Sequence, residues 1–264
     1  MNYASDFRRI ARDGLRGKWS VAVITCFIAY LFGAGIASSG TLGTFDTESL
    51  GDTFSELQMG DIWLKIEVIF SLISLVLVVF ALVAMIMSGA IKFGYALFNL
   101  KLINKKRVDV SDLFSQKNRV LDGVVMNFLT GLYTFLWTLL FIIPGIVKAY
   151  SYAMTPYIMA ENPGMSANDA ITESREIMDG NKWRLVCLGL SFIGWDLLCA
   201  LPTFILSMFI ITASVVTDSV GLLIWIFPAM IPSLVASLFV STYKEAAYAA
   251  FYQDVKRAPS IITE

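Results

Sequence analysis

The chain has 264 residues, of which 57% are hydrophobic and 16% are charged, and it contains no histidine. Soluble domains are about 25% charged and about half apolar, so this composition excludes an ordinary water-soluble globule and indicates an integral membrane protein. The absence of histidine excludes imidazole general bases, Ser-His-Asp and Cys-His pairs, and histidine-ligated metal sites. The formal net charge of -1 says little by itself, because the position of each charge matters more in a membrane protein.

Candidate membrane spans are stretches without Asp, Glu, Lys or Arg, since a helix needs about 20 apolar residues to cross the hydrocarbon core. Six such stretches cover residues 19–37, 68–91, 123–147, 149–160, 197–217, which extends back through Asp196 to residue 185, and 219–243. The fourth is short and joins the third across Pro144-Gly145, a helix-breaking pair that could turn the chain. We therefore expect six spans, or five if the chain does not turn there.

The distribution of Lys and Arg favours six spans with both termini in the cytoplasm. Basic residues gather before the first span, between the second and third, and after the sixth, whereas the first loop is acidic. A turn at Pro144-Gly145 places every basic loop on the cytoplasmic side of the cell membrane. A cleaved signal peptide is the alternative for residues 1–37, but its apolar run is longer than usual.

An amphipathic segment precedes each odd-numbered span, with Ser5, Ser111 and Ser166 as the expected N-caps. Gly180 is the expected stop of the third segment. We predict an all-α polytopic transmembrane bundle of three hairpins, each preceded by an amphipathic helix on the cytoplasmic surface. Residues 1–264 form one integral membrane domain in this prediction. A threefold repeat over residues 1–104, 105–162 and 163–264 would explain the pattern; the alternative is that similar hairpins acquired similar ends independently.

Lys148 and Asp196 lie inside candidate spans, where a charge costs at least about 2.5 kcal/mol and indicates function by default. Asp196 follows Arg184 by 12 residues and Lys148 precedes Ala160 by 12 residues. At 1.5 Å per residue, both stand about 18 Å from the assumed cytoplasmic boundary. Equal depth predicts an ion pair, which could be structural or part of a proton or substrate relay, beside a hinge at Pro144 and Gly145.

The even-numbered spans end alike, with Lys92, Lys148 and Lys244 each about one helical turn before a Tyr-Ala pair. These lysines, with Tyr152 and Tyr248, could line one basic cavity that accepts phospholipid headgroups or another anionic ligand. Lysines that extend to water at the membrane interface are the alternative. No metal-ligand cluster, phosphate-binding loop or paired-carboxylate motif is evident in the sequence, so we expect no metal, cofactor or catalytic residue, and no nucleic acid partner.

Four segments of the second half of the chain resemble a known family. They are FIIPGIVKAYSYAM (141–154), AITESREIM (170–178), GNKWR (180–184) and LSFIGW (190–195). These segments are similar to the bacterial integral membrane proteins grouped as domain of unknown function 975. The resemblance covers nearly the whole chain, is most specific over residues 141–195, and implies a polytopic bacterial membrane protein. It also implies a distant similarity to the membrane domain attached to some glycerophosphodiester phosphodiesterases, but it brings no activity and no catalytic residues.

The expected function is that of a non-enzymatic transport or export component, or of a small-ligand permease, with Lys148 and Asp196 at its polar core. The alternative is a membrane scaffold or regulatory partner whose surface helices bind lipid or another protein, a second copy of the chain included. A lipid-modifying enzyme is less favoured, because the sequence has neither histidine nor a recognisable acid–base pair.

Overall fold

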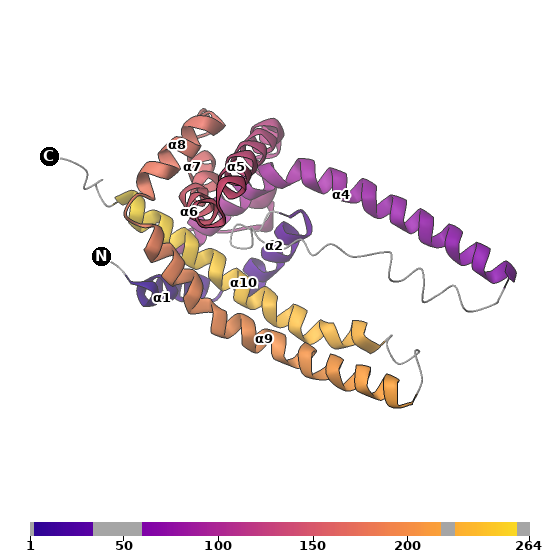
Figure 1. Ribbon diagram of the computed structural model, residues 1–264. Coiled ribbons are helices and arrows are strands. Elements are labelled where there is room, and N and C mark those ends of the chain that lie inside the picture. The colour runs from indigo at the N-terminus through magenta and orange to yellow at the C-terminus, as the bar shows by residue number, and fades with distance from the viewer. Residues whose placement is uncertain (1–2, 34–59, 218–224, 258–264) are drawn as a thin grey trace.

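The computed structural model describes residues 3–33, 60–217 and 225–257 (Figure 1). These residues form helices and connecting segments without any β-strand, which confirms the all-α prediction for the described part of the chain. The elements are α1 (Ala4–Leu15), α2 (Trp19–Leu31), α4 (Gly60–Ile103), the short 3-10 helices η1 (Val110–Phe114) and η2 (Lys117–Arg119), α5 (Val120–Leu140), α6 (Ile142–Tyr152), α7 (Thr155–Glu161), α8 (Ala167–Ile177), α9 (Lys182–Val216) and α10 (Ile226–Arg257).

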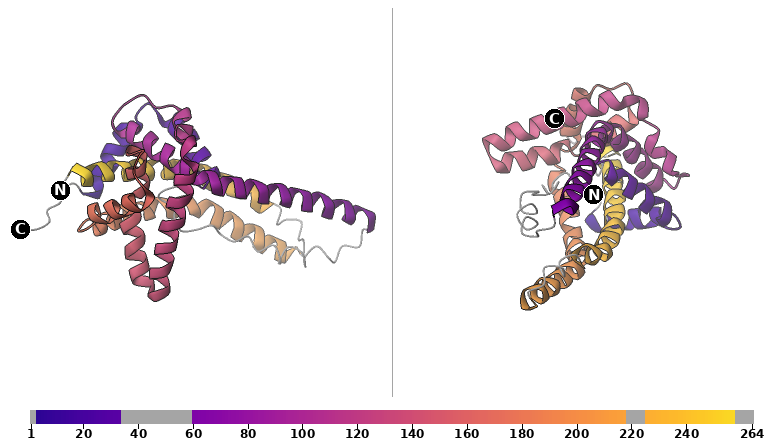
Figure 2. Two further views of the ribbon diagram at one scale, coloured as in Figure 1. Left: turned by 90° about the horizontal axis from the view of Figure 1, so that it is seen from above. Right: turned by 90° about the vertical axis from the view of Figure 1, so that its right-hand side faces the viewer.

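The helices form a packed base from which three arms project (Figures 1 and 2). We call α1, α2, α7, α8 and the C-terminal parts of α4 and α10 the base. The arms are the first part of α4, the α5–α6 hairpin, and the α9–α10 hairpin. Figure 2 shows that α4 and the α9–α10 hairpin leave the base in the same general direction, whereas the α5–α6 hairpin lies crosswise to them.

Aromatic side chains form the core of the base. In α1 the amphipathic spacing buries Phe7 and Leu15 while Arg9 faces outward. The Phe7 ring meets Phe251 of α10 edge-on, with 5.3 Å between ring centroids. Burial of these large rings, each of which removes apolar area from water, stabilises the base as in a soluble helical domain.

Arg184 joins three helices at the start of α9. One guanidinium nitrogen, Nη2, lies 2.5 Å from Oδ2 of Asp254 on α10. The same guanidinium lies over the rings of Phe7 and Phe251, 5.7 Å from each centroid. Because a bonded arginine can also stack on aromatic faces, this one residue fastens the α9–α10 hairpin to α1.

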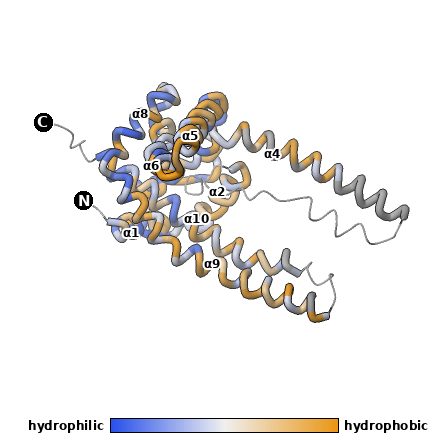
Figure 3. Tube along the Cα trace, viewed as in Figure 1, coloured by the Kyte–Doolittle hydropathy of each residue, from blue (hydrophilic) through white to orange (hydrophobic). Residues whose placement is uncertain are grey.

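Hydrophobic residues predominate along the described parts of the arms (Figure 3), and many of their large apolar side chains are exposed. Val76 on α4 is 66% exposed, Phe209 on α9 is 73% exposed, and Ile143 at the start of α6 is 76% exposed. Contiguous apolar surface of this extent is not typical of a protein surrounded by water, and it marks a surface made for contact with lipid or another protein.

Three helical segments within the described residues are long and apolar enough to cross a membrane, rather than the predicted six. They are Ile86–Ile103, Val110–Leu140 and Lys182–Ser214. Trp19–Leu31 and Ser71–Phe80 are apolar but shorter. Residues 34–37 and 219–224 of the first and last predicted spans lie outside the described residues. The six-span arrangement therefore stays a prediction.

Two helices continue past the charged residues that limit their predicted spans. Helix α4 continues past Ile91 to Ile103, and α10 continues past Tyr243 to Arg257, so both helices carry charged residues from an arm into the base. The predicted helix over residues 149–160 is divided between α6 and α7. Pro156 lies in the first turn of α7, a position where proline favours a helix start.

The three predicted surface helices agree with the structure to different degrees. For α8, the structure confirms Ser166 as the N-cap, since its hydroxyl accepts a hydrogen bond from the Asp169 N–H, and Gly180 adopts φ +72° after the helix. Helix α1 begins one residue before the expected N-cap Ser5. The second segment starts with 3-10 helices capped by Asp109 rather than with an α-helix capped by Ser111. The threefold repeat stays a prediction, and its second unit has this different start.

Two glycines let α5 cross α4 at backbone contact. A side chain added at Gly89 would overlap the backbone of Gly123, and the reverse substitution would overlap the backbone of Gly89 and Ala90. Helices that meet at paired small residues approach more closely than ordinary side chains allow. This crossing fixes where the α5–α6 hairpin leaves the base.

Gly89→Ala is expected to lower the midpoint of thermal unfolding of the detergent-purified chain, because over-packing at a rigid contact costs about 1–3 kcal/mol or more. Gly194→Ala on α9 is the matched control. An added methyl group meets nothing within 4 Å at Gly194, and alanine favours the helix by up to about 1 kcal/mol. Equal effects of the two substitutions would contradict the crossing.

Alkaline pH is expected to destabilise the base through Tyr252. Burial, and then a 2.8 Å hydrogen bond that the phenol donates to Glu161, raise the pKa of Tyr252 above its ordinary value. Because the unfolded chain releases this proton first, stability is intact below pH about 10 and falls above it. The fall in midpoint between pH about 9 and about 11 should be smaller in Tyr252→Phe; an equal fall would contradict this.

Candidate functional site

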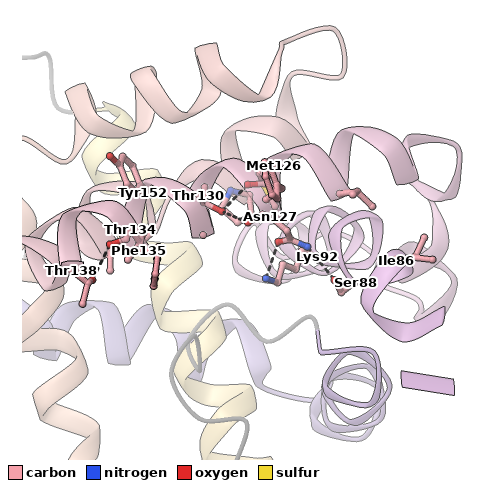
Figure 4. A pocket seen from close by; sticks show the side chains of 16 residues that line it. Ile86, Ser88, Lys92, Met126, Asn127, Thr130, Thr134, Phe135, Thr138 and Tyr152 are labelled. Atoms are coloured by element: carbon pink, nitrogen blue, oxygen red, sulfur yellow. Dashed lines mark hydrogen bonds between the residues drawn. The ribbon is translucent and has the colours of Figure 1, made fainter. Parts of the chain in front are cut away.

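A groove of about 790 Å³ lies between α4 and the α5–α6 hairpin and reaches the start of α7 (Figure 4). It is lined by residues from four helices. They are Ile86, Ser88 and Lys92 of α4; Val124, Met126, Asn127, Phe128, Thr130, Gly131, Thr134, Phe135 and Thr138 of α5; Ala149, Tyr152 and Ala153; and Pro156. The volume lies within the range of about 300–1,000 Å³ that is typical of small-molecule sites.

Most of the polar groups in the groove follow one stripe of α5. Asn127, Thr130, Thr134 and Thr138 recur at spacings of three or four residues, which places them on one helix face. The hydroxyl of Thr130 donates to the carbonyl oxygen of Met126, and that of Thr138 donates to the carbonyl oxygen of Thr134. These bonds within the helix satisfy the hydroxyl hydrogens and leave the groove wall weakly polar.

Lys92 is the one cationic residue among those that line the groove. Its Nζ donates to Oδ1 of Asn127 over 3.0 Å, and Nδ2 of Asn127 donates to Oγ of Ser88 over 3.0 Å (Figure 4). Ser88 and Lys92 stand one helical turn apart on α4, so both reach α5 from the same face. The ammonium is thus oriented by a neutral amide, and the charge of the buried Glu245 on α10 also acts on it.

Tyr152 lies across the groove from α4 and is the second sequence-predicted residue that lines it. Its ring centroid is 6.3 Å from that of Tyr133, and its side chain is largely buried. Lys148, Lys244 and Tyr248 are not among the lining residues. The structure does not form the predicted cavity shared by all three lysines; of the three, only Lys92 lines the groove.

The predicted Lys148–Asp196 ion pair is not the contact that the structure makes. Oδ2 of Asp196 lies 3.7 Å from Nζ of Lys244, its neighbour across the α9–α10 hairpin, and the Asp196 side chain is 48% exposed. Lys148 instead places its Nζ over the Trp137 ring, 4.7 Å from the centroid. The prediction assumed parallel hairpins at equal depth, but the α5–α6 hairpin lies crosswise to α9 (Figure 2).

The chain reverses direction close to the predicted hinge at Pro144 and Gly145. The reversal falls at Phe141, whose extended backbone ends α5, and Pro144 lies in the first turn of α6. A side chain at Gly145 would overlap Thr138 of α5, so this glycine allows the two helices to lie close together. Pro144 and Gly145 therefore shape the end of the hairpin that forms one wall of the groove.

Sequence reasoning missed Glu245, a carboxylate that is 0% exposed on α10. The negative charge of Glu245 interacts electrostatically with the ammonium group of Lys92 in the groove. It also acts on Tyr157, whose pKa is raised well above its ordinary value, first by burial and then by Glu245. The signal available in the sequence was the alanine-rich run after Glu245, which is typical of a closely packed helix. Asn127 was missed as the partner of Lys92 because it belongs to a different hairpin, and Ser88 was missed as the partner of Asn127.

Comparison with known families concerns mainly the second half of the chain. Residues 142–259 match the family described as "Protein of unknown function (DUF975)". We call residues 142–259 the DUF975 segment. The match confirms the resemblance seen in the sequence, over a shorter range than expected: the DUF975 segment runs from α6 through α10, and Lys92 and α5 precede it. No curated protein and no solved structure matches the chain.

The pairing of charges in and around the DUF975 segment can be tested by double-mutant cycles on unfolding free energy in detergent micelles. Asp196→Asn and Lys244→Met should be coupled by up to about 1 kcal/mol, the range for half-exposed pairs. Asp196→Asn and Lys148→Met should be additive within about 0.5 kcal/mol. Coupling of Asp196 to Lys148 but not to Lys244 would contradict the contacts described above.

Proposed function

We propose that this chain is a multi-pass membrane protein that binds a small amphiphilic anion in the α4–α5–α6 groove, as a non-enzymatic permease or export component. Support for the membrane setting comes from the exposed apolar arms and from three helical segments of sufficient length. The basic residues of α1 favour a cytoplasmic N-terminus, and the cell membrane is the proposed location.

The position of Lys92 carries the proposal. An ammonium in a mostly apolar groove attracts a negative group more strongly than it would in water, because the surrounding dielectric constant is lower. Asn127 fixes its direction, and the apolar residues along α5 and α6 offer a surface for a hydrocarbon tail. A ligand with one anionic head and one apolar tail would satisfy both parts of the groove.

Lys92 replaces the Lys148–Asp196 region as the proposed polar centre. Asp196 and Lys244 join the two helices of one hairpin, a contact that supports a structural role, and neither residue lines the groove. A groove open to a ligand supports the transport class over the scaffold class, whose expected surface helices α1 and α8 bury their apolar faces within the base.

Native mass spectrometry of the detergent-purified chain tests the proposal with oleic acid as the anionic probe. Oleyl alcohol, which has the same tail and no charge, is the comparison ligand. We expect oleate to be retained in preference to the alcohol. Lys92→Met should weaken oleate retention by about tenfold or more, since a charge-assisted bond contributes about 1.5–3 kcal/mol.

Lys148→Met provides the matched control, because it removes the same charge from a lysine outside the groove. This variant should retain oleate like the parent chain. Thermal unfolding midpoints of both variants separate loss of binding from loss of folding. Equal retention of oleate and oleyl alcohol, or an equal loss in the two variants, would exclude the groove as the anion site.

A further inference from the structure

Two turns at the edge of the base bring five cationic residues together. One turn joins α1 to α2, and the other follows α4. They are fastened by a hydrogen bond that Nζ of Lys18 donates to the carbonyl oxygen of Lys106 over 2.5 Å, 88 residues away in the chain. The two-turn basic surface consists of Arg16, Lys18, Lys105, Lys106 and Arg107.

Lys105 occupies a backbone conformation that normally belongs to glycine. Its φ is +57°, and no other non-glycine residue of the described ranges has a positive φ. The N–H of Lys106 bonds to the carbonyl of Lys101, and that of Lys105 bonds to the carbonyl of Leu102, which is the Schellman pattern of a helix end. The neighbouring turn uses Gly17 at φ +76°. A lysine in this conformation is strained relative to glycine.

A residue with a strained backbone conformation in a simple turn suggests that its side chain has a function. The Lys105 side chain is exposed, as are those of the neighbouring Lys106 and Arg107. The carboxylates nearby in the chain are Asp109, which caps η1, and Asp112, which lies 2.6 Å from Lys101.

On α1, Asp13 is exposed one turn before Gly17. Three carboxylates therefore stand near six cations, which are the five of the two turns and Lys101; Asp109 accepts a hydrogen bond from Ser111, and Asp112 pairs with Lys101. The two-turn basic surface keeps an excess of positive charge, which favours an anionic partner.

Apolar helices adjoin the two-turn basic surface. The apolar helix α2 starts directly after Lys18, and its side chains Phe27 and Leu31 are about half exposed. The segment Ile86–Ile103, which ends two residues before Lys105, lies largely in the base, where 72% of it is buried. The exposed apolar side chains of α2 are suited to lipid contact, and cationic residues at the end of such a helix are favoured at the depth of the lipid headgroups.

We propose that the two-turn basic surface is a binding site for the phosphate of anionic phospholipid headgroups. Lys105 and its neighbours on the second turn bind the phosphate, while Lys18 holds the two turns together through the Lys106 carbonyl. The site is separate from the Lys92 groove and does not depend on the function proposed for that groove.

Native mass spectrometry of the full chain in detergent tests the site, with dioleoylphosphatidylglycerol and dioleoylphosphatidylcholine as paired probes. We expect preferential retention of phosphatidylglycerol. Lys105→Gly should weaken that retention roughly fivefold, the effect of one interfacial charge. The same substitution should leave the unfolding midpoint of the lipid-free chain unchanged or raise it, because glycine relieves the positive φ. A purely structural lysine would not give this opposite pair of effects.

Arg175→Gln is the matched control, since Arg175 is exposed on α8, a helix that packs against α5, α6 and α7. It should leave phosphatidylglycerol retention unchanged. Inorganic phosphate should not raise the unfolding midpoint; a rise equal to that given by phosphatidylglycerol would identify free phosphate as the ligand and overturn the lipid site. Equal retention of the two lipids, or full retention by Lys105→Gly, would also overturn it.

Discussion

The exposed apolar surface of the arms determines which environment the molecule needs. Phe209 on α9 and Ile143 on α6 expose about three quarters of their surfaces, and the helices around them do not cover them. The base contains aromatic residues that are fully buried, among them Phe7 and Phe251, so it can fold by the packing that stabilises soluble helical domains. The arms need hydrocarbon or another apolar partner to lower the free energy of the same kind of side chain. Two kinds of stabilisation therefore meet where the arms join the base.

That junction also forms the groove. Backbone contact at Gly89 and Gly123 brings α5 against α4, and one turn further along each helix Lys92 and Asn127 meet at 3.0 Å. A wider crossing would separate the ammonium from the amide that orients it. The base determines where the α5–α6 hairpin starts, and the close approach at Gly145 determines how near α6 lies to α5. The positions of glycines thus control the shape of a site whose chemistry depends on lysine.

Local signals predicted much of the fold, whereas contacts between distant segments could not be predicted. The cap at Ser166, the reversal near Pro144 and the amphipathic spacing of α1 each depend on a few neighbouring residues, and they were found from the sequence. Lys92 and Tyr152 were predicted as candidate residues from a repeated motif, but Asn127 became the partner of Lys92 only through the crossing of α4 and α5. The predicted partner of Asp196 was wrong, because the depth of a charge along its own helix carries no information on the direction of the neighbouring hairpin.

Spin labels on the arms and on the base test the division between them most directly. Single cysteines at Val79, Phe209 and Arg175, in a chain whose native cysteines are replaced by alanine, report collisions with oxygen and with a water-soluble nickel complex in lipid vesicles. The structure predicts that labels at Val79 and Phe209 collide mainly with oxygen, which concentrates in hydrocarbon, and that the label at Arg175 collides mainly with the nickel complex. Equal access of the nickel complex to all three labels would contradict the account of apolar arms embedded in lipid.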